Sequence, residues 1–211
     1  MQALNITIIP VGTLGTNCYL ITSQKGAAAL IDPGAGGEKI AGILEEKGCT
    51  LRCILLTHGH WDHTGAVRYL LGKYPEAECH IGRGDKEQVT DEERFADMLR
   101  GCRWEDHYIP EAKELADGDK IELDEVTLSV METPGHSLGS VCFVCRDAIF
   151  SGDTVFLENV GRCDLYGGCF DTMKASLSRL AALPGDYAVY PGHGLTTTLQ
   201  YEREKNPYFP R

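Results

Sequence analysis

The sequence predicts an α/β fold in which two sheets pack face to face and helices cover their outer sides. Short apolar runs bounded by Gly, Pro or Asp alternate with segments whose apolar residues recur at helical spacing. Each half of the chain is rich in the short runs and closes with helical segments. Polar turns containing His or Asp follow several runs, at the carboxyl ends where open α/β sheets usually carry their chemistry.

The elements of the first half follow from these patterns in chain order. Apolar runs bounded by turn residues predict strands at residues 5–10, 18–22, 27–32, 52–56 and 77–81. Apolar residues three and four apart predict helices over 36–48 and 62–74. Residues 85–100 are charged and helical with a sparse apolar side. They fit either a lid over the edge of the sheets where the chemistry is expected or, as we favour, a peripheral surface helix.

The second half is dominated by strands. Apolar runs predict them at residues 120–123, 126–132, 141–145, 148–150 and 188–190. Arg146 and Asp147 separate two of these runs and predict a tight hairpin turn. A helix is predicted over residues 171–183, and a short charged helix ends the chain.

Composition limits the functions that this chain can have. A length of 211 residues with 43% hydrophobic residues allows one sizeable core, so we expect a single domain over residues 1–211. The net charge of −11 disfavours a nucleic-acid partner, because neutralising phosphates requires clustered Lys and Arg. The sequence shows no signal-peptide pattern, and no apolar stretch approaches the roughly 18 residues of a membrane span. We expect a soluble, cytoplasmic protein without a membrane partner, and the oligomeric state stays open.

Nine cysteines lie along the chain without a repeating framework, so we expect buried or free thiols. Cys142 and Cys145 form a C-x-x-C pair inside a predicted strand. Residues three apart in a strand point to opposite faces. This pair is therefore not expected to share a metal ion or a disulfide bond.

Three imidazoles and a carboxylate lie within residues 58–63, directly after a predicted strand. Neutral imidazole and carboxylate are ligands that zinc and iron accept readily, so this segment predicts a metal site rather than a solvated His-rich loop. Three further Gly-bounded turns, at residues 134–137, 151–154 and 191–194, each add a His or Asp. The candidate ligands are His58, His60, Asp62, His63, His136, Asp153 and His193. One catalytic zinc takes three protein ligands, whereas two adjacent metal ions would use all seven.

In their order along the chain, these motifs resemble those of the metallo-β-lactamase-fold hydrolases, and most of all the short glyoxalase II-like (hydroxyacylglutathione hydrolase-like) group. The resemblance also includes Asp32-Pro33-Gly34, Val160-Gly161-Arg162 and the tail at residues 202–207. It implies an αββα four-layer sandwich with the metal site at the edge of the two packed sheets. It also implies two divalent metal ions, for which zinc is favoured and iron or manganese are the alternatives.

The resemblance assigns each candidate ligand to a metal ion. His58, His60 and His136 would hold one ion, Asp62, His63 and His193 would hold the other, and Asp153 would bridge them. A zinc ion lowers the pKa of bound water to about 7, so a bridging hydroxide would be available to attack an acyl carbonyl. A thioester such as an S-2-hydroxyacylglutathione is the natural substrate, because its thiolate leaving group has a thiol pKa of only about 8.5. Asp62 is also a candidate catalytic residue, as a proton shuttle.

Residues around the predicted metal centre have alternative roles. Asp32 either orients a ligand imidazole or only forms the turn before Pro33. Arg162 lies where the family's loop places a basic substrate-contacting residue, with Tyr166 close by in the sequence, but Arg162 could equally pair with Asp164.

Two further features concern the substrate loop and the end of the chain. Cys163 and Cys169 are either oxidation-sensitive thiols near the metal or, as we favour, space-filling residues. Full-length glyoxalase II enzymes carry a C-terminal helical domain that supplies much of the glutathione pocket. Here only residues 196–211 remain after the last motif, so we expect no such domain, and the thiol carrier stays open.

Other functions remain as alternatives. A mononuclear Fe(II) persulfide dioxygenase of the same fold would need only His58, His136 and Asp153, a set that suits oxygen chemistry. Lactone or β-lactam hydrolysis could use the same metal ions. The best known β-lactamases carry Cys where Asp153 stands, and nuclease members are more basic than this chain. Outside enzymology, the chain could be a metal-binding or redox-sensing protein without turnover.

Overall fold

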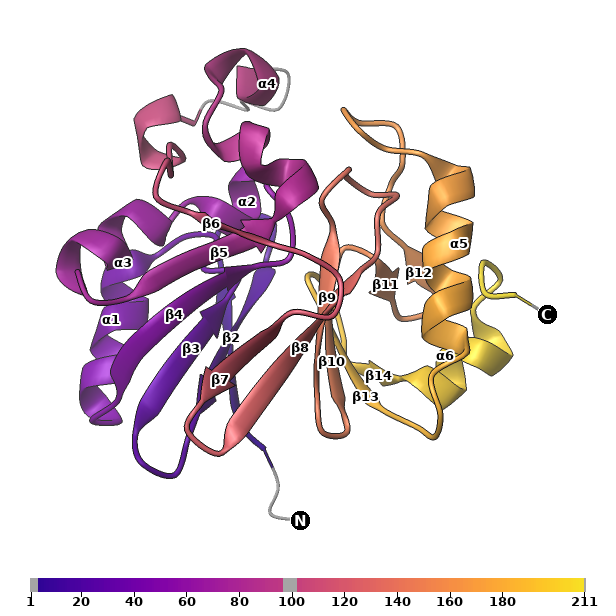
Figure 1. Ribbon diagram of the computed structural model, residues 1–211, viewed down its shortest axis with the longest axis horizontal. Helices are drawn as coiled ribbons and strands as arrows, with labels where there is room; N and C mark the ends of the chain where they lie inside the picture. Colours follow the sequence, from indigo (N-terminus) through magenta and orange to yellow (C-terminus); the bar gives the residue numbers. More distant parts are fainter. Residues whose placement is uncertain (1–3, 97–101, 211) are drawn as a thin grey trace.

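Two six-stranded sheets face each other, and helices cover the outer side of each (Figure 1). The computed structural model describes residues 4–96 and 102–210. The strand order is β1-β2-β3-β4-β5-β6 in the first sheet and β14-β13-β10-β9-β8-β7 in the second. Helices α1 and α3 lie outside the first sheet, and α5 and α6 lie outside the second (Figure 1). The predicted αββα sandwich is therefore confirmed.

The first sheet begins with an antiparallel meander and continues with parallel strands. Pairs β1–β2 and β2–β3 are antiparallel, whereas β3–β4, β4–β5 and β5–β6 are parallel. Its strands are β1 (Asn5–Val11), β2 (Thr16–Thr22), β3 (Ala27–Ile31), β4 (Thr50–Leu56), β5 (Glu78–Gly82) and β6 (Lys113–Leu115). The helical connections are α1 (Gly37–Glu46), α2 (Trp61–Thr64), α3 (Val67–Lys73), the 3₁₀ helix η1 (Arg83–Val89), α4 (Glu92–Ala96) and the 3₁₀ helix η2 (Trp104–Asp106).

The second sheet is mostly antiparallel, with one parallel pair, β10–β13. The register of that pair shifts between Phe150 and Gly152. Its strands are β7 (Lys120–Leu123), β8 (Val126–Glu132), β9 (Val141–Cys145), β10 (Ala148–Gly152), β13 (Ala188–Pro191) and β14 (Thr197–Thr198). A small two-stranded sheet, β11 (Val155–Phe156) and β12 (Asn159–Val160), precedes α5 (Phe170–Ala181), and α6 (Leu199–Lys205) follows β14.

Three apolar clusters fill the spaces between the layers. The central cluster lies between the sheets and includes Tyr19 and Phe150, whose ring centroids are 5.2 Å apart. A second cluster joins α1 and α3 to the first sheet, and a third joins α5 to the second. Cys142 belongs to the third cluster and Cys145 to the central one. The two cysteines therefore point to opposite faces of β9, as predicted, and all nine cysteines are free thiols.

Several elements differ from the sequence prediction for identifiable reasons. The single helix predicted over 62–74 is wrong, because α2 and α3 are separated at Gly65 and Ala66. A Cβ atom on Gly65 would lie 2.5 Å from the Gly34 carbonyl oxygen, and the Ala66 amide donates to the Pro33 carbonyl. Contact with the turn after β3 thus interrupts the helix. The sequence analysis also missed β6, β11, β12 and β14, which have two or three residues each.

The segment predicted as one surface helix over 85–100 is divided. Its described part forms η1 and then α4, while residues 97–100 lie outside the described residues. Asp85, Gln88 and Val89 of η1 are buried, so this end is not a surface element. Among the residues that the structure describes, no helix combines the length and apolar character needed to cross a membrane.

Replacement of Phe150 tests the central core. Phe150 has no exposed surface, so Phe150→Ala should lower the free energy of unfolding by about 3–5 kcal/mol through lost burial and a residual cavity. Phe170→Ala is the matched control. Phe170 is 42% exposed, so its replacement should lower the free energy of unfolding much less. Urea unfolding of both variants provides the comparison, and equal losses would contradict this description of the core.

His107 should make stability depend on pH. It is buried and shares a 2.8 Å hydrogen bond with Thr64, and burial lowers its pKa to about 4 despite the nearby carboxylates. In the unfolded chain His107 binds a proton at a pKa near 6.5, whereas in the folded chain it stays neutral down to about pH 4. Its contribution to the free energy of unfolding is therefore fully present above pH 6.5 and is lost as the pH falls towards 4. In chemical unfolding at several pH values, the wild type should lose more stability over this range than His107→Gln. Equal pH slopes would contradict the expectation.

Candidate metal centre

The seven candidate ligands lie along one edge of the sandwich, beyond the carboxyl ends of four strands. Those strands are β4, β8, β10 and β13, and the segments that follow them lie at the upper edge of the molecule in Figure 1. Strands β10 and β13 run parallel, and β8 has the same direction because both β8 and β10 are antiparallel to β9. The sheet topology therefore delivers motifs that are far apart in the sequence to one edge.

Three histidines form the first group. His58, His60 and His136 are buried, and their ligand atoms lie within 4.8 Å of one another. His136 Nε2 is only 2.9 Å from His60 Nδ1. His136 is oriented from behind by its Nδ1, which is 2.7 Å from the carbonyl oxygen of Arg162. The first group is thus deeply placed and held by backbone as well as by side chains.

Asp62, His63 and His193 form the second group, and their ligand atoms also lie within 4.8 Å of one another. His193 Nε2 is 3.1 Å from Asp62 Oδ2 and 3.3 Å from His63 Nε2. The side chains of His193 and Asp62 are 25% and 13% exposed, whereas that of His63 has no exposed surface. Solvent therefore reaches the centre from the side of the second group.

Asp153 lies between the two groups. One carboxylate oxygen, Oδ1, is 3.5 Å from His63 Nε2, and the other, Oδ2, is 3.5 Å from His136 Nε2. Gly192 allows this approach, because a Cβ atom there would lie 2.3 Å from Asp153 Oδ1 and 2.8 Å from His63 Cε1. A side chain at position 192 would therefore occupy the space between the two groups.

The donor set fits bound cations. His58 Nε2, His60 Nε2 and Asp153 Oδ1 are buried polar atoms without a hydrogen-bond partner among the described residues. Such atoms are rare in folded proteins, because burial without a partner costs free energy. Here they belong to a cluster in which imidazole nitrogens and carboxylate oxygens face one another, which is the donor chemistry of zinc and iron sites. The His and Asp groups are consistent with a centre for two metal ions.

Protonation differs between the two groups in the metal-free chain. Burial, followed by the neighbouring imidazoles, holds the pKa of His58 and His60 well below the usual range. Burial acts in the same direction on His63, but Asp32, Asp153 and Asp62 outweigh it and raise the pKa of His63 to about 10. Burial thus favours the neutral, metal-binding form of His58 and His60, whereas the surrounding carboxylates favour the protonated form of His63.

Asp32 supports the second group from behind. It follows β3 in the left-handed region, with a φ of 51°, and so forms the turn before Pro33. Its carboxylate accepts from the Thr57 amide at 2.8 Å and the Thr57 hydroxyl at 2.6 Å, and lies 3.0 Å from His63 Nδ1. Asp32 is thus in position for both roles that the sequence left open, and His63 Nε2 faces the centre.

The side chains of the two predicted substrate-contacting residues, Arg162 and Tyr166, are engaged with other partners. The guanidinium of Arg162 donates to both carboxylate oxygens of Asp164, at 2.6 and 2.7 Å. The ring of Tyr166 instead lies beneath Arg94, whose guanidinium carbon is 5.1 Å from the ring centroid. The structure therefore shows the Arg162–Asp164 pair that was one of the two alternatives, and it brings only the backbone of Arg162 to a candidate ligand.

Two supporting residues were not predicted from the sequence. Thr16 donates from its hydroxyl to Asp62 Oδ2 at 3.3 Å. Asp85 is fully buried and accepts hydrogen bonds from Gly59 and Ser137, which are neighbours of candidate ligands. A threonine at the start of a strand and an aspartate among charged residues give no local signal of these contacts.

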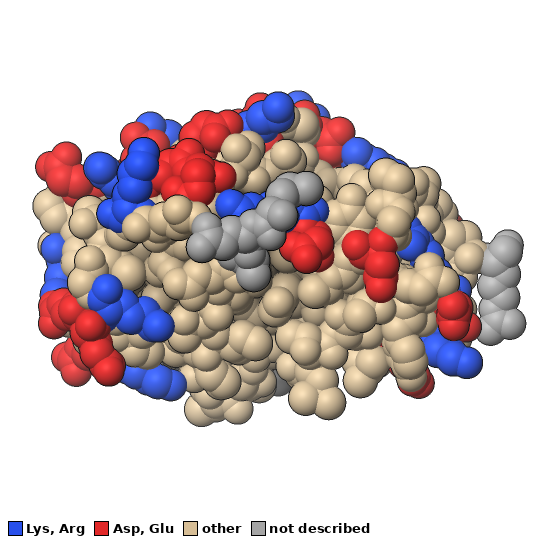
Figure 2. All heavy atoms as spheres, turned by 90° about the horizontal axis from the view of Figure 1, so that it is seen from below, with Lys and Arg blue, Asp and Glu red and all other residues tan. Residues whose placement is uncertain are grey.

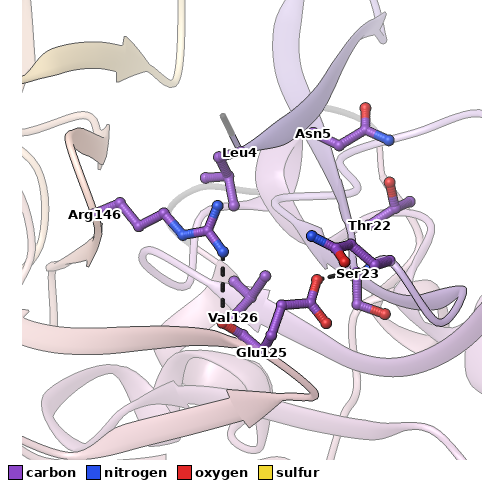
Figure 3. Close-up of a pocket in the computed structure, with 8 residues that line it drawn as sticks. Leu4, Asn5, Thr22, Ser23, Glu125, Val126 and Arg146 are labelled. Carbon is purple, nitrogen blue, oxygen red and sulfur yellow. Dashed lines mark hydrogen bonds between the residues drawn. The ribbon is translucent and has the colours of Figure 1, made fainter. Parts of the chain in front are cut away.

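A separate pocket lies at the opposite edge of the sheets (Figure 3). Leu4, Ser23, Glu125 and Arg146 are among the residues that line it, and they come from the chain before β1, the end of β2 and two hairpin turns. Arg146 Nη2 is 3.5 Å from the Glu125 carbonyl oxygen. Figure 2 shows the molecule from this side, where basic and acidic side chains are interspersed around a broad neutral area. The pocket contains none of the candidate ligands.

Comparisons with known proteins agree with this geometry. The curated relatives include the hydroxyacylglutathione hydrolase GloC of Haemophilus influenzae, which is 32% identical over 97% of this chain and 98% of its own. The probable metallo-hydrolase YqgX of Bacillus subtilis is 35% identical over 95% of each chain.

Solved structures of similar proteins share this fold. The BLEG-1 B3 metallo-beta-lactamase superposes with a TM-score of 0.90 at 30% identity, covering 98% of this chain and 100% of its own. A di-iron-bound form of TTHA1623 has a TM-score of 0.83 at 33% identity, covering 96% and 100%. The family model described as the metallo-beta-lactamase superfamily matches residues 11–193, so the chain belongs to that superfamily.

Proposed function

We propose that this protein is a metal-dependent hydrolase that cleaves small-molecule acyl thioesters, with S-2-hydroxyacylglutathione as a representative substrate. The observation that carries the proposal is the convergence of seven His and Asp side chains, three of which place a buried polar atom without a hydrogen-bond partner among the described residues. The similarity to hydroxyacylglutathione hydrolase GloC supports the thioester class.

Two metal ions are proposed rather than one. His58, His60 and His136 would hold the first, and Asp62, His63 and His193 the second, with Asp153 between them. The 3.5 Å distances from the two oxygens of Asp153 to His63 and His136 support a shared carboxylate. A persulfide dioxygenase with one iron would leave the second group without a role. Zinc is the favoured metal, and the di-iron-bound TTHA1623 supports iron as the alternative.

Bound in this way, two metal ions would supply an ionised water at neutral pH and polarise the acyl carbonyl. The residues of the chain orient the reactants and move protons. Asp32 fixes the ring of His63, and the Arg162 carbonyl fixes that of His136. Asp62 lies on the solvent-accessible side and its Oδ2 accepts a hydrogen bond from the Thr16 hydroxyl, so its carboxylate would be placed to shuttle a proton between the site and solvent.

The leaving group decides the substrate class. A thiolate departs without strong help from a general acid because thiols have a pKa of about 8.5, whereas an amine leaving group needs a proton. The carboxylates and imidazoles of the cluster are paired with one another. The cluster therefore has no obvious side chain to protonate a leaving group. Arg162 and Tyr166 are the proposed contacts for the thiol carrier, at the border of the site.

Lactone or β-lactam ring opening is a second candidate. It is favoured by the similarity to the BLEG-1 B3 metallo-beta-lactamase, which covers nearly the whole of both chains. The same metal ions would serve both reactions, so only substrate comparison separates them.

Metal content and hydrolysis should test the proposed function together. We expect two zinc ions per chain after reconstitution, with hydrolysis of S-lactoylglutathione or simple thioesters that disappears on chelation and returns with zinc. Thioesters should exceed lactones and β-lactams in kcat/KM. A zinc-loaded chain inactive on all of these would identify a binding protein. One iron per chain with oxygen consumption on glutathione persulfide would identify a dioxygenase.

Arg162 should contribute to binding an anionic thiol carrier. If it contacts the carrier, Arg162→Ala should raise KM for a glutathione thioester about 10-fold with little change in kcat, because a charged hydrogen bond to the substrate is lost. Asp164→Asn is the control, since it releases the guanidinium and should not raise KM. An equal rise in KM for both variants would show that Arg162 acts only through its ion pair with Asp164. The same conclusion would follow if Arg162→Ala left KM unchanged for thioesters of both uncharged and anionic thiols.

A further inference from the structure

Asp85 connects the two loops that form the first group of histidines. It lies in η1, has no exposed surface and is not one of the seven candidate ligands. Its Oδ2 accepts from the Gly59 amide at 3.0 Å and from the Ser137 hydroxyl at 2.6 Å. Its Oδ1 accepts from the Gly139 amide at 2.7 Å and from Gln88 Nε2 at 2.8 Å.

The partners of Asp85 Oδ2 are direct neighbours of ligands. Gly59 stands between His58 and His60, and Ser137 follows His136. One oxygen atom thus holds the backbone of one loop and the side chain of the other. The 2.9 Å approach of His136 Nε2 to His60 Nδ1 depends on the relative position of these two loops.

The segments around Asp85 are closely packed at three glycines. A Cβ atom on Gly139 would lie 2.2 Å from the Asp85 nitrogen, and one on Gly82 would lie 2.1 Å from the Gly139 oxygen. A Cβ atom on Gly59 would lie 2.7 Å from the Cβ of Gln88. The segments that carry the hydrogen-bond donors to Asp85 are therefore in close contact with η1.

All four groups that face the carboxylate donate hydrogen bonds, so Asp85 acts only as an acceptor. Burial of a carboxylate is costly unless such donors compensate it. Its hydrogen bonds join three separate segments, whereas an apolar residue of similar size would only fill the space. The arrangement thus fixes positions as well as volume.

We propose that Asp85 is a positioning residue that sets the metal affinity of the group formed by His58, His60 and His136. It holds Gly59 and Ser137 at the separation at which the three imidazoles share one centre. The inference rests on the proposed metal centre but is independent of the substrate.

Asp85→Asn tests the inference with little change in shape. The amide retains one acceptor oxygen, and whichever way it is oriented its NH₂ group faces one backbone N–H, that of Gly59 or Gly139, so at least that contact is lost. We expect zinc affinity to fall about 10- to 100-fold, the range for residues that support metal ligands from behind. Affinity is measured by competition with a chromophoric chelator, in the wild type and in a His193→Ala background that weakens the second group.

Glu202→Gln is the matched control. Glu202 is also fully buried and accepts from the Glu158 amide, the Thr197 hydroxyl and the Asn206 side chain. It secures α6 and contacts none of the candidate ligands. Urea unfolding of the metal-free proteins measures the structural cost of each variant. Glu202→Gln should lose stability but retain the zinc affinity of the first group.

The measurements can overturn the positioning role of Asp85 in several ways. Unchanged zinc affinity in Asp85→Asn, or an equal loss in Glu202→Gln, would overturn the positioning role while leaving the proposed hydrolase intact. If Asp85→Asn does not fold, Ser137→Ala removes one of the four contacts and should weaken zinc binding about 2- to 10-fold, and no change would overturn the inference. A wild-type chain that binds no zinc would contradict the metal centre itself.

Discussion

A cluster of buried histidines and aspartates that face one another, with three of their polar atoms unpaired among the described residues, is the constraint on which this structure depends. Isolated in a protein interior, such groups would be too costly to retain. They are held here by contacts from behind, through Asp32 to His63 and through the Arg162 carbonyl to His136. The fold thus brings the candidate ligand atoms to face one another.

The two sheets contribute unequally to that arrangement. The loop after β4 supplies four of the seven side chains, and the second sheet supplies His136, Asp153 and His193 from three separate loops. The centre thus exists only when both sheets are packed together. Packing across the central core, through residues such as Tyr19 and Phe150, is therefore coupled to the geometry of the site.

Local patterns in the sequence predicted most of the fold and the seven candidate ligands that the structure brings together, because apolar periodicity marks strands and Gly-bounded turns mark their ends. They could not predict the break between α2 and α3, which arises from contact of Gly65 with Gly34. They also missed Asp85, since nothing near it distinguishes a buried carboxylate from the exposed charges of the same segment. For Arg162, the alternatives depended on where its side chain points, and the structure shows it against Asp164.

The shift in register between β10 and β13 has a consequence for variation in this chain. It falls between Phe150, which is part of the central core, and Gly152, which immediately precedes Asp153. Simple alternation along the strand therefore does not set the direction of that carboxylate; the number of residues after Phe150 does. Deleting or inserting a single residue there would turn the carboxylate of Asp153 away from both groups of candidate ligands, even if every residue type were kept.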